Sequence, residues 1–441
     1  MRRFPLAGFA SAMALSVAAS LPSVASAQDL GRLLERAARD SLRQALDPQR
    51  PERNAFPSNP GSRPNPYPFP NPNPTRATDP GRTPASPRKV ETHAIKTADG
   101  WTLVALRYRP TALPRPGAAT MPVILCHGLT YNARFWDLDP SCSFAEYLAA
   151  QGFDVWVVNL RGCGLSQKWV WSLEDAPEAF IGGLIRRSTH GKYGSTGYAS
   201  IDPKYANWSM DDHVAYDVPA LVSLVRGKTG APEVAWVGHS MGGIVALAHL
   251  CRFQNPGIGR LVAIGSQFTM PEGQIPAQFL RELLTTRERQ VSGVARGPEL
   301  IAQSKTSVQN LFFNSRNVMP EVYQALTTDA TDVPSIGLMR QYLSMAENGA
   351  LLDARRQFNY ASGLRNVTVP LFLGCGASDR FAPPVVQKFL FDRVGSADKT
   401  MVVFGRAEGF AAEAGHNDVL VGLNSRVQVY PVLAKWLAAP H

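Results

Sequence analysis

The chain has 441 residues, 45% of them hydrophobic, and a formal net charge of +10 at neutral pH, which is typical of a globular protein with a sizeable core. A basic excess favours nucleic acid or membrane surfaces as partners. However, residues 1–88 carry twelve arginines against six acids, which leaves only +4 for residues 89–441. A nucleic-acid binder concentrates basic residues on one module, so we expect no nucleic-acid partner.

The first 27 residues have the pattern of an export signal. Arginines at positions 2 and 3 precede an apolar stretch from Phe4 to Leu21, and Ala25-Ser26-Ala27 supplies the small residues that a signal peptidase requires. A membrane anchor is the alternative, but the stretch is rich in Ala and Ser and ends at Pro22. We therefore expect cleavage before Gln28 and a periplasmic or extracellular protein.

Two further segments precede the main domain. Leu and Ala recur at three- and four-residue steps between residues 29 and 47, which predicts an amphipathic helix within residues 28–50. This helix either packs on the domain, which we favour, or gives a peripheral contact with a membrane or lipid surface. Residues 51–88 hold twelve prolines in 38 positions and therefore predict an extended linker. The main domain should span residues 89–441.

Strand-like and helix-like runs alternate through that domain. The strand-like runs are Val90–Ile95, Thr102–Tyr108, Pro122–Cys126, Asp154–Asn159, Glu233–Val237, Arg260–Ile264, Val369–Leu373 and Thr400–Phe404. The helix-like runs are Ser143–Gln151, Met210–Lys228, Met241–Arg252, Pro384–Asp392 and Arg426–Leu437. The alternation predicts one α/β domain with about eight strands in a mostly parallel sheet.

Two segments interrupt this alternation. Residues 269–365 are mostly helix-like, contain five prolines and are too long for a simple crossover. We expect them to form a helical cap inserted over the functional site. Residues 163–207 contain several aromatic side chains and are interpreted as a second wall of that site.

Ser240 is the candidate nucleophile. It stands in Gly238-His239-Ser240-Met241-Gly242, between a predicted strand and a predicted helix. This is the G-x-S-x-G nucleophile elbow of α/β-hydrolases, in which a sharp turn exposes the serine above the sheet. Glycine at positions 238 and 242 removes the Cβ atoms that would clash with the turn.

A serine hydroxyl is a weak nucleophile unless a base takes its proton. In α/β-hydrolases an acid and then a histidine follow the serine along the chain. His249 lies in the helix after the nucleophile and His441 is the last residue, which leaves His416 as the base. Asp379, in the loop after Val369–Leu373, fits the acid that orients the imidazole. Asp392 and Asp398 are interpreted as solvated, and Asp353 lies in the cap.

An oxyanion requires two fixed N–H donors. One is the amide of Met241, directly after the nucleophile. The other is expected from Leu129, because Gly128 allows a tight turn after the strand Pro122–Cys126. His127 is expected to hold this loop by hydrogen bonds.

Asp211, Asp212, His213 and Asp217 together resemble a metal cluster. They fall at a predicted helix start, where the two aspartates suit the first turn beside a capping Ser209. His213 and Asp217 are interpreted as an i, i+4 surface pair. We therefore expect no metal and no cofactor.

The five cysteines fit no zinc pattern. Export permits a disulfide, and Cys142–Cys163 is the candidate pair because both lie in loops. Cys126, Cys251 and Cys375 fall in apolar runs and are expected in the core.

Several motifs together resemble the acid lipase branch (the gastric and lysosomal type) of the α/β-hydrolases. They are His127–Leu129, Gly152–Trp156, Asn159–Gly162, Trp208–Asp212, Tyr216–Pro219 and Val237–Ser240. The resemblance implies a Ser240, Asp379 and His416 triad, oxyanion donors at Leu129 and Met241, and acyl esters with an apolar chain as substrates. Met241-Gly242-Gly243 departs from that branch and resembles bacterial serine esterases.

A serine lipase or esterase is therefore the first hypothesis. Leu138–Pro140 and Gly152–Trp156 also resemble polyhydroxyalkanoate synthases, which use Cys where this chain has Ser240, so short polyesters stay open as substrates. Acyl transfer or amide cleavage on the same triad is a second hypothesis. A non-catalytic exported binding protein is a third.

Overall fold

The computed structural model describes residues 90–113, 121–168, 207–253, 257–271, 274, 280–281, 284–285 and 311–440. The predicted export signal (1–27), helix (28–50) and linker (51–88) lie outside the described residues, as does His441. Within the described part of the chain, no helix combines the length and the apolar character that crossing a membrane requires.

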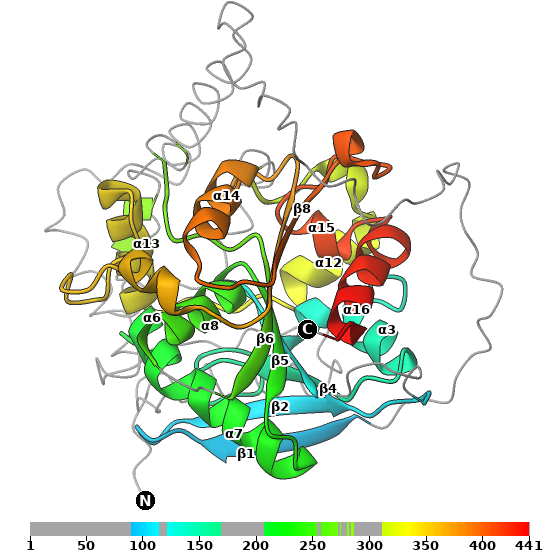
Figure 1. Ribbon diagram of the computed structural model, residues 1–441, viewed down its shortest axis with the longest axis horizontal. Coiled ribbons are helices and arrows are strands. Elements are labelled where there is room, and N and C mark those ends of the chain that lie inside the picture. Colours follow the sequence, from blue (N-terminus) through cyan, green and yellow to red (C-terminus); the bar gives the residue numbers. More distant parts are fainter. Residues whose placement is uncertain are drawn as a thin grey trace, which may run out of the picture.

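Eight strands form one sheet in the order β1-β2-β4-β3-β5-β6-β7-β8 (Figure 1). Of these eight, β2 alone runs against the others, because it pairs antiparallel with both β1 and β4. The prediction of a mostly parallel sheet is confirmed. The strands are β1 (Glu91–Lys96), β2 (Thr102–Tyr108), β3 (Val123–Cys126), β4 (Val155–Asn159), β5 (Val234–His239), β6 (Ile258–Ile264), β7 (Leu371–Gly376) and β8 (Lys399–Phe404).

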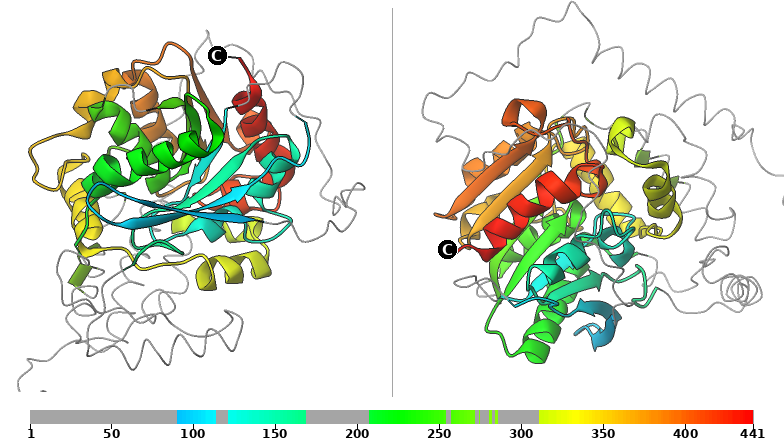
Figure 2. Two further views of the ribbon diagram at one scale, coloured as in Figure 1. Left: turned by 90° about the horizontal axis from the view of Figure 1, so that it is seen from below. Right: turned by 90° about the vertical axis from the view of Figure 1, so that its right-hand side faces the viewer.

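Helices cover both faces of the sheet (Figures 1 and 2). The described α-helices are α3 (Phe144–Ala150), α6 (Met210–Asp212), α7 (Val218–Thr229), α8 (Met241–Arg252), α12 (Pro320–Thr328), α13 (Ile336–Asn348), α14 (Pro384–Arg393), α15 (Asp418–Val421) and α16 (Tyr430–Ala438). A π-helical turn, His213–Asp217, joins α6 to α7, and another, Ser425–Val429, precedes α16. Helices α7, α8 and α14 pack on one face, and α3, α15 and α16 pack on the other.

The central strands are buried on both sides. In β3, Ile124 and Cys126 face the core shared with α7 and α8, while Val123 and Leu125 face the core shared with α3 and α16. Alternate side chains of a strand point to opposite faces, so a strand covered twice must be apolar throughout. This explains why these strands appear as continuous apolar runs in the sequence.

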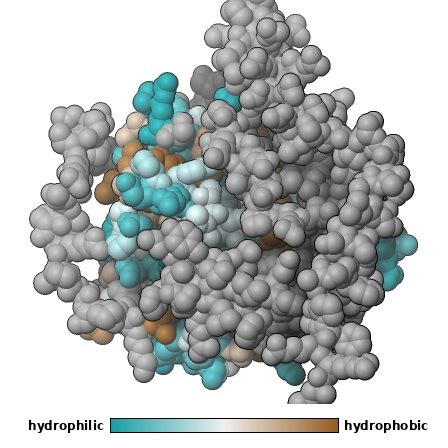
Figure 3. Space-filling model, turned by 180° about the vertical axis from the view of Figure 1, so that it is seen from behind, coloured by the Kyte–Doolittle hydropathy of each residue, from teal (hydrophilic) through white to brown (hydrophobic). Residues whose placement is uncertain are grey.

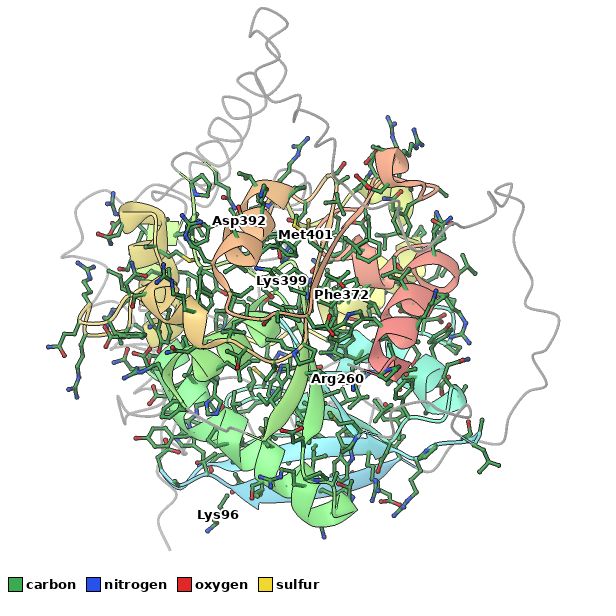
Figure 4. The ribbon with its side chains drawn as sticks, in the orientation of Figure 1. Lys96, Arg260, Phe372, Asp392, Lys399 and Met401 are labelled. Atoms are coloured by element: carbon green, nitrogen blue, oxygen red, sulfur yellow. The ribbon has the colours of Figure 1, made fainter. Side chains whose placement is uncertain are left out.

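Two basic side chains connect strands to helix ends near the amino-terminal ends of the parallel strands (Figure 4). Arg260 of β6 donates from Nη1 to the carbonyl oxygens of Leu437 at 2.8 Å and Ala439 at 3.0 Å, at the end of α16. Lys399 of β8 donates to the Phe391 carbonyl in α14 at 2.7 Å. Such contacts satisfy carbonyls that a helix end leaves unpaired.

The described part of residues 269–365 contains helices, and their place as a cap over the site stays a prediction. Strand β6 ends at Ile264 and β7 begins at Leu371, and α12 and α13 lie between them. Residues 286–310 of the cap and 169–206 of the second predicted wall lie outside the described part of the chain.

The disulfide prediction is wrong, because all five cysteines are free in the structure. Cys142 is packed with Phe144 in the core on the α3 side. Cys163 lies in the loop after β4, where burial and then the nearby Asp332 raise the pKa of its thiol. Cys126, Cys251 and Cys375 are buried, as expected.

The described surface is mixed in character. Seen from behind, hydrophilic and hydrophobic residues are interspersed over the coloured part of the molecule (Figure 3). The exposed large apolar side chains come from separate elements: Leu113, Leu165, Phe253, Val385, Leu423 and Val427. Single apolar residues of this kind are ordinary surface features.

Candidate active site

The functional residues gather where the strand order reverses. Strand β3 lies between β4 and β5, so the chain crosses to one side after β3 and to the other side after β4. Cys126 at the end of β3 pairs with Gly238 of β5. Ligands of open α/β sheets bind at such a switch point, beside the carboxyl ends of the strands. The loops that follow β3 and β5 therefore meet at the candidate site.

Ser240 occupies a strained turn between β5 and α8. Its φ of 52° and ψ of −119° lie in a region that L-residues rarely adopt. A Cβ on Gly238 would lie 2.2 Å from the Gly243 nitrogen, and a Cβ on Gly242 would lie 2.2 Å from the Cys126 carbonyl oxygen. The elbow therefore requires glycine at both positions, in agreement with the sequence interpretation.

The structure brings together the three residues predicted as a triad. His416, in the loop before α15, has its Nε2 at 3.0 Å from Ser240 Oγ and its Nδ1 at 2.9 Å from Asp379 Oδ2. The other oxygen of Asp379 accepts from the backbone N–H groups of Phe381 at 2.9 Å and Ala382 at 2.6 Å.

This hydrogen bonding assigns the tautomer of His416. A carboxylate can only accept, so Nδ1 carries the proton and Nε2 accepts from the Ser240 hydroxyl. All three side chains are buried. The arrangement can remove a proton from Ser240 and place the resulting charge beside Asp379.

Two positions that contact His416 have roles that sequence reasoning missed. The sequence indicates His239 only as part of the elbow, yet its Nε2 donates to the backbone carbonyl of His416 at 3.0 Å. Gly265, with φ +63°, lies so close that a Cβ there would be 3.0 Å from the His416 ring. The one sequence feature that could have indicated a role for Gly265 is its position directly after the apolar strand β6.

The predicted oxyanion donors flank the nucleophile. A Cβ on Gly128 would lie 3.1 Å from Ser240 Cβ, so the loop after β3 lies against the serine. Among the described residues, neither the Leu129 N–H nor the Met241 N–H donates to a backbone carbonyl. Met241 begins α8, and first-turn N–H groups at the positive end of a helix are available to an anion.

His127 stabilises the loop after β3 through two hydrogen bonds of its ring. Its Nε2 accepts from the Leu160 N–H at 3.2 Å, so the proton is on Nδ1, which donates to the Gly128 carbonyl at 2.9 Å. Burial lowers the pKa of His127 to about 4, opposed in part by the bond to Gly128. A neutral imidazole is required for this pair of bonds.

An apolar wall lies beside the proposed base. The ring of Phe381 is 4.8 Å from that of His416, and the ring of Phe312 is 5.9 Å away. Leu129, Leu280 and Leu311 are half-buried and pack against the same core. The two phenylalanine rings give the surroundings of His416 an apolar character.

The acidic residues near α6 have structural roles. The described residues contain no group of three or more ligands that could hold a metal ion. Ser209 is the N-cap of α6, as predicted, and forms a capping box with Asp212. Asp211 accepts from the Tyr360 hydroxyl at 2.5 Å and the Ala354 N–H at 2.6 Å, and so ties α6 to residues of the predicted cap.

The prediction of a His213–Asp217 surface pair is wrong, because both side chains are fully buried. Asp217 accepts from His213 Nδ1 at 2.7 Å and from Arg161 Nε at 2.9 Å. Burial alone would raise the pKa of Asp217, but these two partners hold it below its ordinary value. Arg161, which is also buried, makes this a core ion pair.

The chain is similar to known proteins in sequence and in fold. The family model described as "Alpha/beta hydrolase family" matches residues 123–421, more than half of the chain. Triacylglycerol lipase 2 from Arabidopsis thaliana is 30% identical over 36% of this chain and 33% of its own length. Lipase member K from Homo sapiens is 29% identical over 48% of this chain and 46% of its own. The chain therefore spans less than half the length of these two relatives.

Among solved structures, a thermophilic esterase from Thermogutta terrifontis superposes with a TM-score of 0.50 at 19% identity. The match covers 79% of this chain and 98% of that one. At this level of identity the likeness concerns the fold alone.

Proposed function

Because the chain belongs to the alpha/beta hydrolase family, we propose that it hydrolyses carboxylic esters with Ser240 as the nucleophile. The observation that carries this proposal is the continuous set of contacts from Ser240 Oγ to His416 at 3.0 Å and from His416 to Asp379 at 2.9 Å. The names of the relatives, a triacylglycerol lipase and a lipase, support the same reaction class.

The first half of the reaction forms an acyl-enzyme. Ser240 Oγ attacks the ester carbonyl carbon while its proton passes to His416 Nε2. The carbonyl oxygen becomes an oxyanion and accepts hydrogen bonds from the N–H groups of Leu129 and Met241. Asp379 stabilises the imidazolium, which then donates its proton to the departing alcohol as the bond from carbon to the alkoxy oxygen breaks.

In the second half, water replaces the alcohol. His416 takes a proton from the water, whose oxygen attacks the acyl carbon. The bond to Ser240 Oγ then breaks, the carboxylic acid leaves, and the serine regains its proton. The net reaction is ester plus water to acid plus alcohol.

Esters with an apolar acyl chain are the proposed substrates. Phe312 and Phe381 lie next to His416, and their rings contact each other with centroids 5.1 Å apart. Apolar walls of this kind bind hydrocarbon through removal of apolar surface from water. Lipid esters are the natural compounds with such chains.

A panel of p-nitrophenyl esters of increasing chain length tests the proposal. Ser240→Ala should lose about 10⁴-fold or more in kcat, because the members of a triad act as a unit. Ser141→Ala removes an exposed hydroxyl and is the matched control that should keep full activity. No turnover by the wild-type protein at any chain length, or unchanged turnover by Ser240→Ala, would refute ester hydrolysis.

Two additions separate the alternatives. A fluorophosphonate probe should label Ser240, whereas a non-catalytic binding protein would not react. Product analysis with alcohol and amine acceptors present should give the free acid as the main product. A jump in turnover above the solubility limit of the ester would indicate a lipase, and saturation below it an esterase.

We also propose that the protein is exported, on the strength of the apolar run and the Ala25-Ser26-Ala27 site in its sequence. The amino-terminal sequence of the secreted or periplasmic protein tests this. A terminus at Gln28 is expected, and a cytoplasmic protein that keeps residues 1–27 would overturn the proposal.

A further inference from the structure

The loop that carries Leu129 is joined to the cap by backbone hydrogen bonds. We call residues 127–132 the oxyanion loop. The Asn132 N–H donates to the Ala330 carbonyl at 3.0 Å, and the Asp332 N–H donates to the Thr130 carbonyl at 2.6 Å. Between them, Tyr131 and Thr331 form an antiparallel bridge. The oxyanion loop and the cap segment 329–332 thus form a short two-stranded ribbon, although some 200 residues separate them in sequence.

The side chain of Asp332 strengthens this ribbon. Its Oδ2 accepts from Asn132 Nδ2 at 2.9 Å and from the Gly164 N–H at 2.7 Å. Its Oδ1 accepts from Lys168 Nζ. One carboxylate therefore connects the cap, the oxyanion loop and the loop after β4.

These contacts of Asp332 matter for stability because its carboxylate is buried. Asp332 is 6% exposed, and a buried carboxylate is tolerated only when its oxygens are hydrogen-bonded or paired with a cation. Here both oxygens have partners. Removing the carboxylate would leave the Asn132 amide, the Gly164 N–H and the Lys168 ammonium each without this acceptor.

The oxyanion loop needs such support. Thr130 has a φ of 67°, a left-handed conformation that is unfavourable for a β-branched residue and persists only where surrounding contacts enforce it. The Thr130 carbonyl is the group that accepts from the Asp332 N–H. Thr130 directly follows Leu129, so a displacement of Thr130 would also move the backbone that carries the proposed oxyanion donor.

We propose that Asp332 is a positioning residue that holds the oxyanion loop so that the Leu129 N–H points to the oxyanion above Ser240. This inference rests on the proposed ester hydrolysis. It also means that the cap contributes to the chemical step, as well as covering the site, because the ribbon transmits any displacement of residues 329–332 to Leu129.

Substitution of Asp332 should lower kcat with little change in KM. Loss of one oxyanion donor costs about 10²–10³-fold in kcat in serine hydrolases, so a displaced Leu129 in Asp332→Ala should cost about 10–100-fold. Asp332→Asn keeps an oxygen that can accept from Asn132 and should lose less. Asp329→Asn changes an exposed carboxylate of the same ribbon and is the control that should keep wild-type kcat.

A reciprocal exchange tests the contact itself. In the native protein the Arg134 N–H donates to Asn132 Oδ1 at 2.9 Å. Asn132→Asp keeps an oxygen for this hydrogen bond but places a second carboxylate next to that of Asp332. Two carboxylates this close repel each other, so the ribbon should shift and kcat should fall by about 10-fold, as a displaced catalytic group costs. The double variant Asn132→Asp with Asp332→Asn restores one carboxylate and one amide, and should recover part of the lost kcat. It also tests the contact if Asp332→Ala does not fold.

Inhibitor binding separates positioning from general stability. An alkyl boronic acid forms a tetrahedral adduct with Ser240, and its Ki should rise in proportion to the loss of kcat/KM. The Ki of a non-hydrolysable ether analogue should stay constant. If the Asp332 variants have lower Tm but unchanged kcat and boronate Ki well below Tm, Asp332 is merely structural and the inference is wrong. Absence of turnover and of fluorophosphonate labelling in the wild-type protein would instead refute the proposed function.

Discussion

His239 Nε2 donates a hydrogen bond to the backbone carbonyl of His416 across 3.0 Å. The residue before the nucleophile therefore holds the backbone of the proposed base. The ring of His239 also stacks on Phe135, with centroids 4.6 Å apart and planes inclined by 13°. Burial, and then the nearby His416, lower the pKa of His239 well below its ordinary value, so its ring is neutral at physiological pH.

Replacing His239 should therefore displace His416. His239→Leu removes the donor and should lower kcat about 10–100-fold, because small displacements of a catalytic group cost about this much. His239→Gln places an N–H donor at a similar reach and should lose less. The measurement is kcat and KM on a soluble ester well below Tm. Equal kcat in the two variants would show that the hydrogen bond has no part in positioning His416.

Much of the site could be predicted because its residues are marked locally. Ser240 lies in a short motif, and α8 begins at Met241 and ends at Arg252, as the pattern indicated. His416 and Asp379 follow strand ends, where chain order selects them among few candidates. A strand buried on both faces is recognisable from composition alone, because every side chain in it must be apolar.

Contacts between segments far apart in the chain could not be predicted. A histidine and an aspartate four residues apart are typical of a helix surface, yet Asp217 is buried because Arg161, 56 residues earlier, pairs with it. Asn132 and Asp332 are 200 residues apart. No local pattern in either segment indicates the ribbon that joins the oxyanion loop to residues 329–332.

Asp379 is predicted to act through its carboxylate. In Asp379→Asn the amide oxygen can still accept from Phe381 and Ala382, but the amide N–H₂ faces His416 Nδ1 and favours the wrong tautomer. Loss of the triad carboxylate typically lowers kcat about 10⁴-fold, and a loss of 10³–10⁴-fold is expected here. Asp392 is exposed on α14 (Figure 4) and paired with Lys388 at 2.8 Å, so Asp392→Asn should keep full activity. The opposite ranking would mean that the acid is misassigned.

The buried ion pair predicts a large effect on stability. Asp217 and Arg161 are 0% and 1% exposed, and Asp217 Oδ1 lies 2.8 Å from Arg161 Nη2. Removing one partner of a buried pair leaves an uncompensated charge and costs about 3–5 kcal/mol. In Asp217→Asn the Arg161 guanidinium keeps Asp99 as a partner, so the free energy of unfolding should fall by about 3 kcal/mol in urea denaturation, the lower end of that range. Asp99 also pairs with Arg161 but is 21% exposed, and Asp99→Asn should cost clearly less. Equal costs would show that burial of Asp217 is not the cause.

The buried histidine of the oxyanion loop predicts how stability depends on pH. His127 has a pKa of about 4 in the folded protein, because burial disfavours its charged form, against 6.5 for an ordinary histidine. Between these values the unfolded chain binds a proton that the folded protein does not bind. The free energy of unfolding should therefore fall as the pH falls from 6.5 to about 4, by up to about 3 kcal/mol.

His127→Gln isolates this contribution, because the glutamine oxygen can accept from the Leu160 N–H and does not titrate. The slope of unfolding free energy against pH counts the protons taken up on unfolding. Between pH 6.5 and 4 that slope should be smaller in the variant, by the equivalent of up to about one proton taken up on unfolding. Burial also lowers the pKa values of His239 and His249, so some slope should persist. Urea denaturation at a series of pH values measures it. An unchanged slope would mean that His127 is protonated in the folded protein and that its Nε2 does not accept from Leu160.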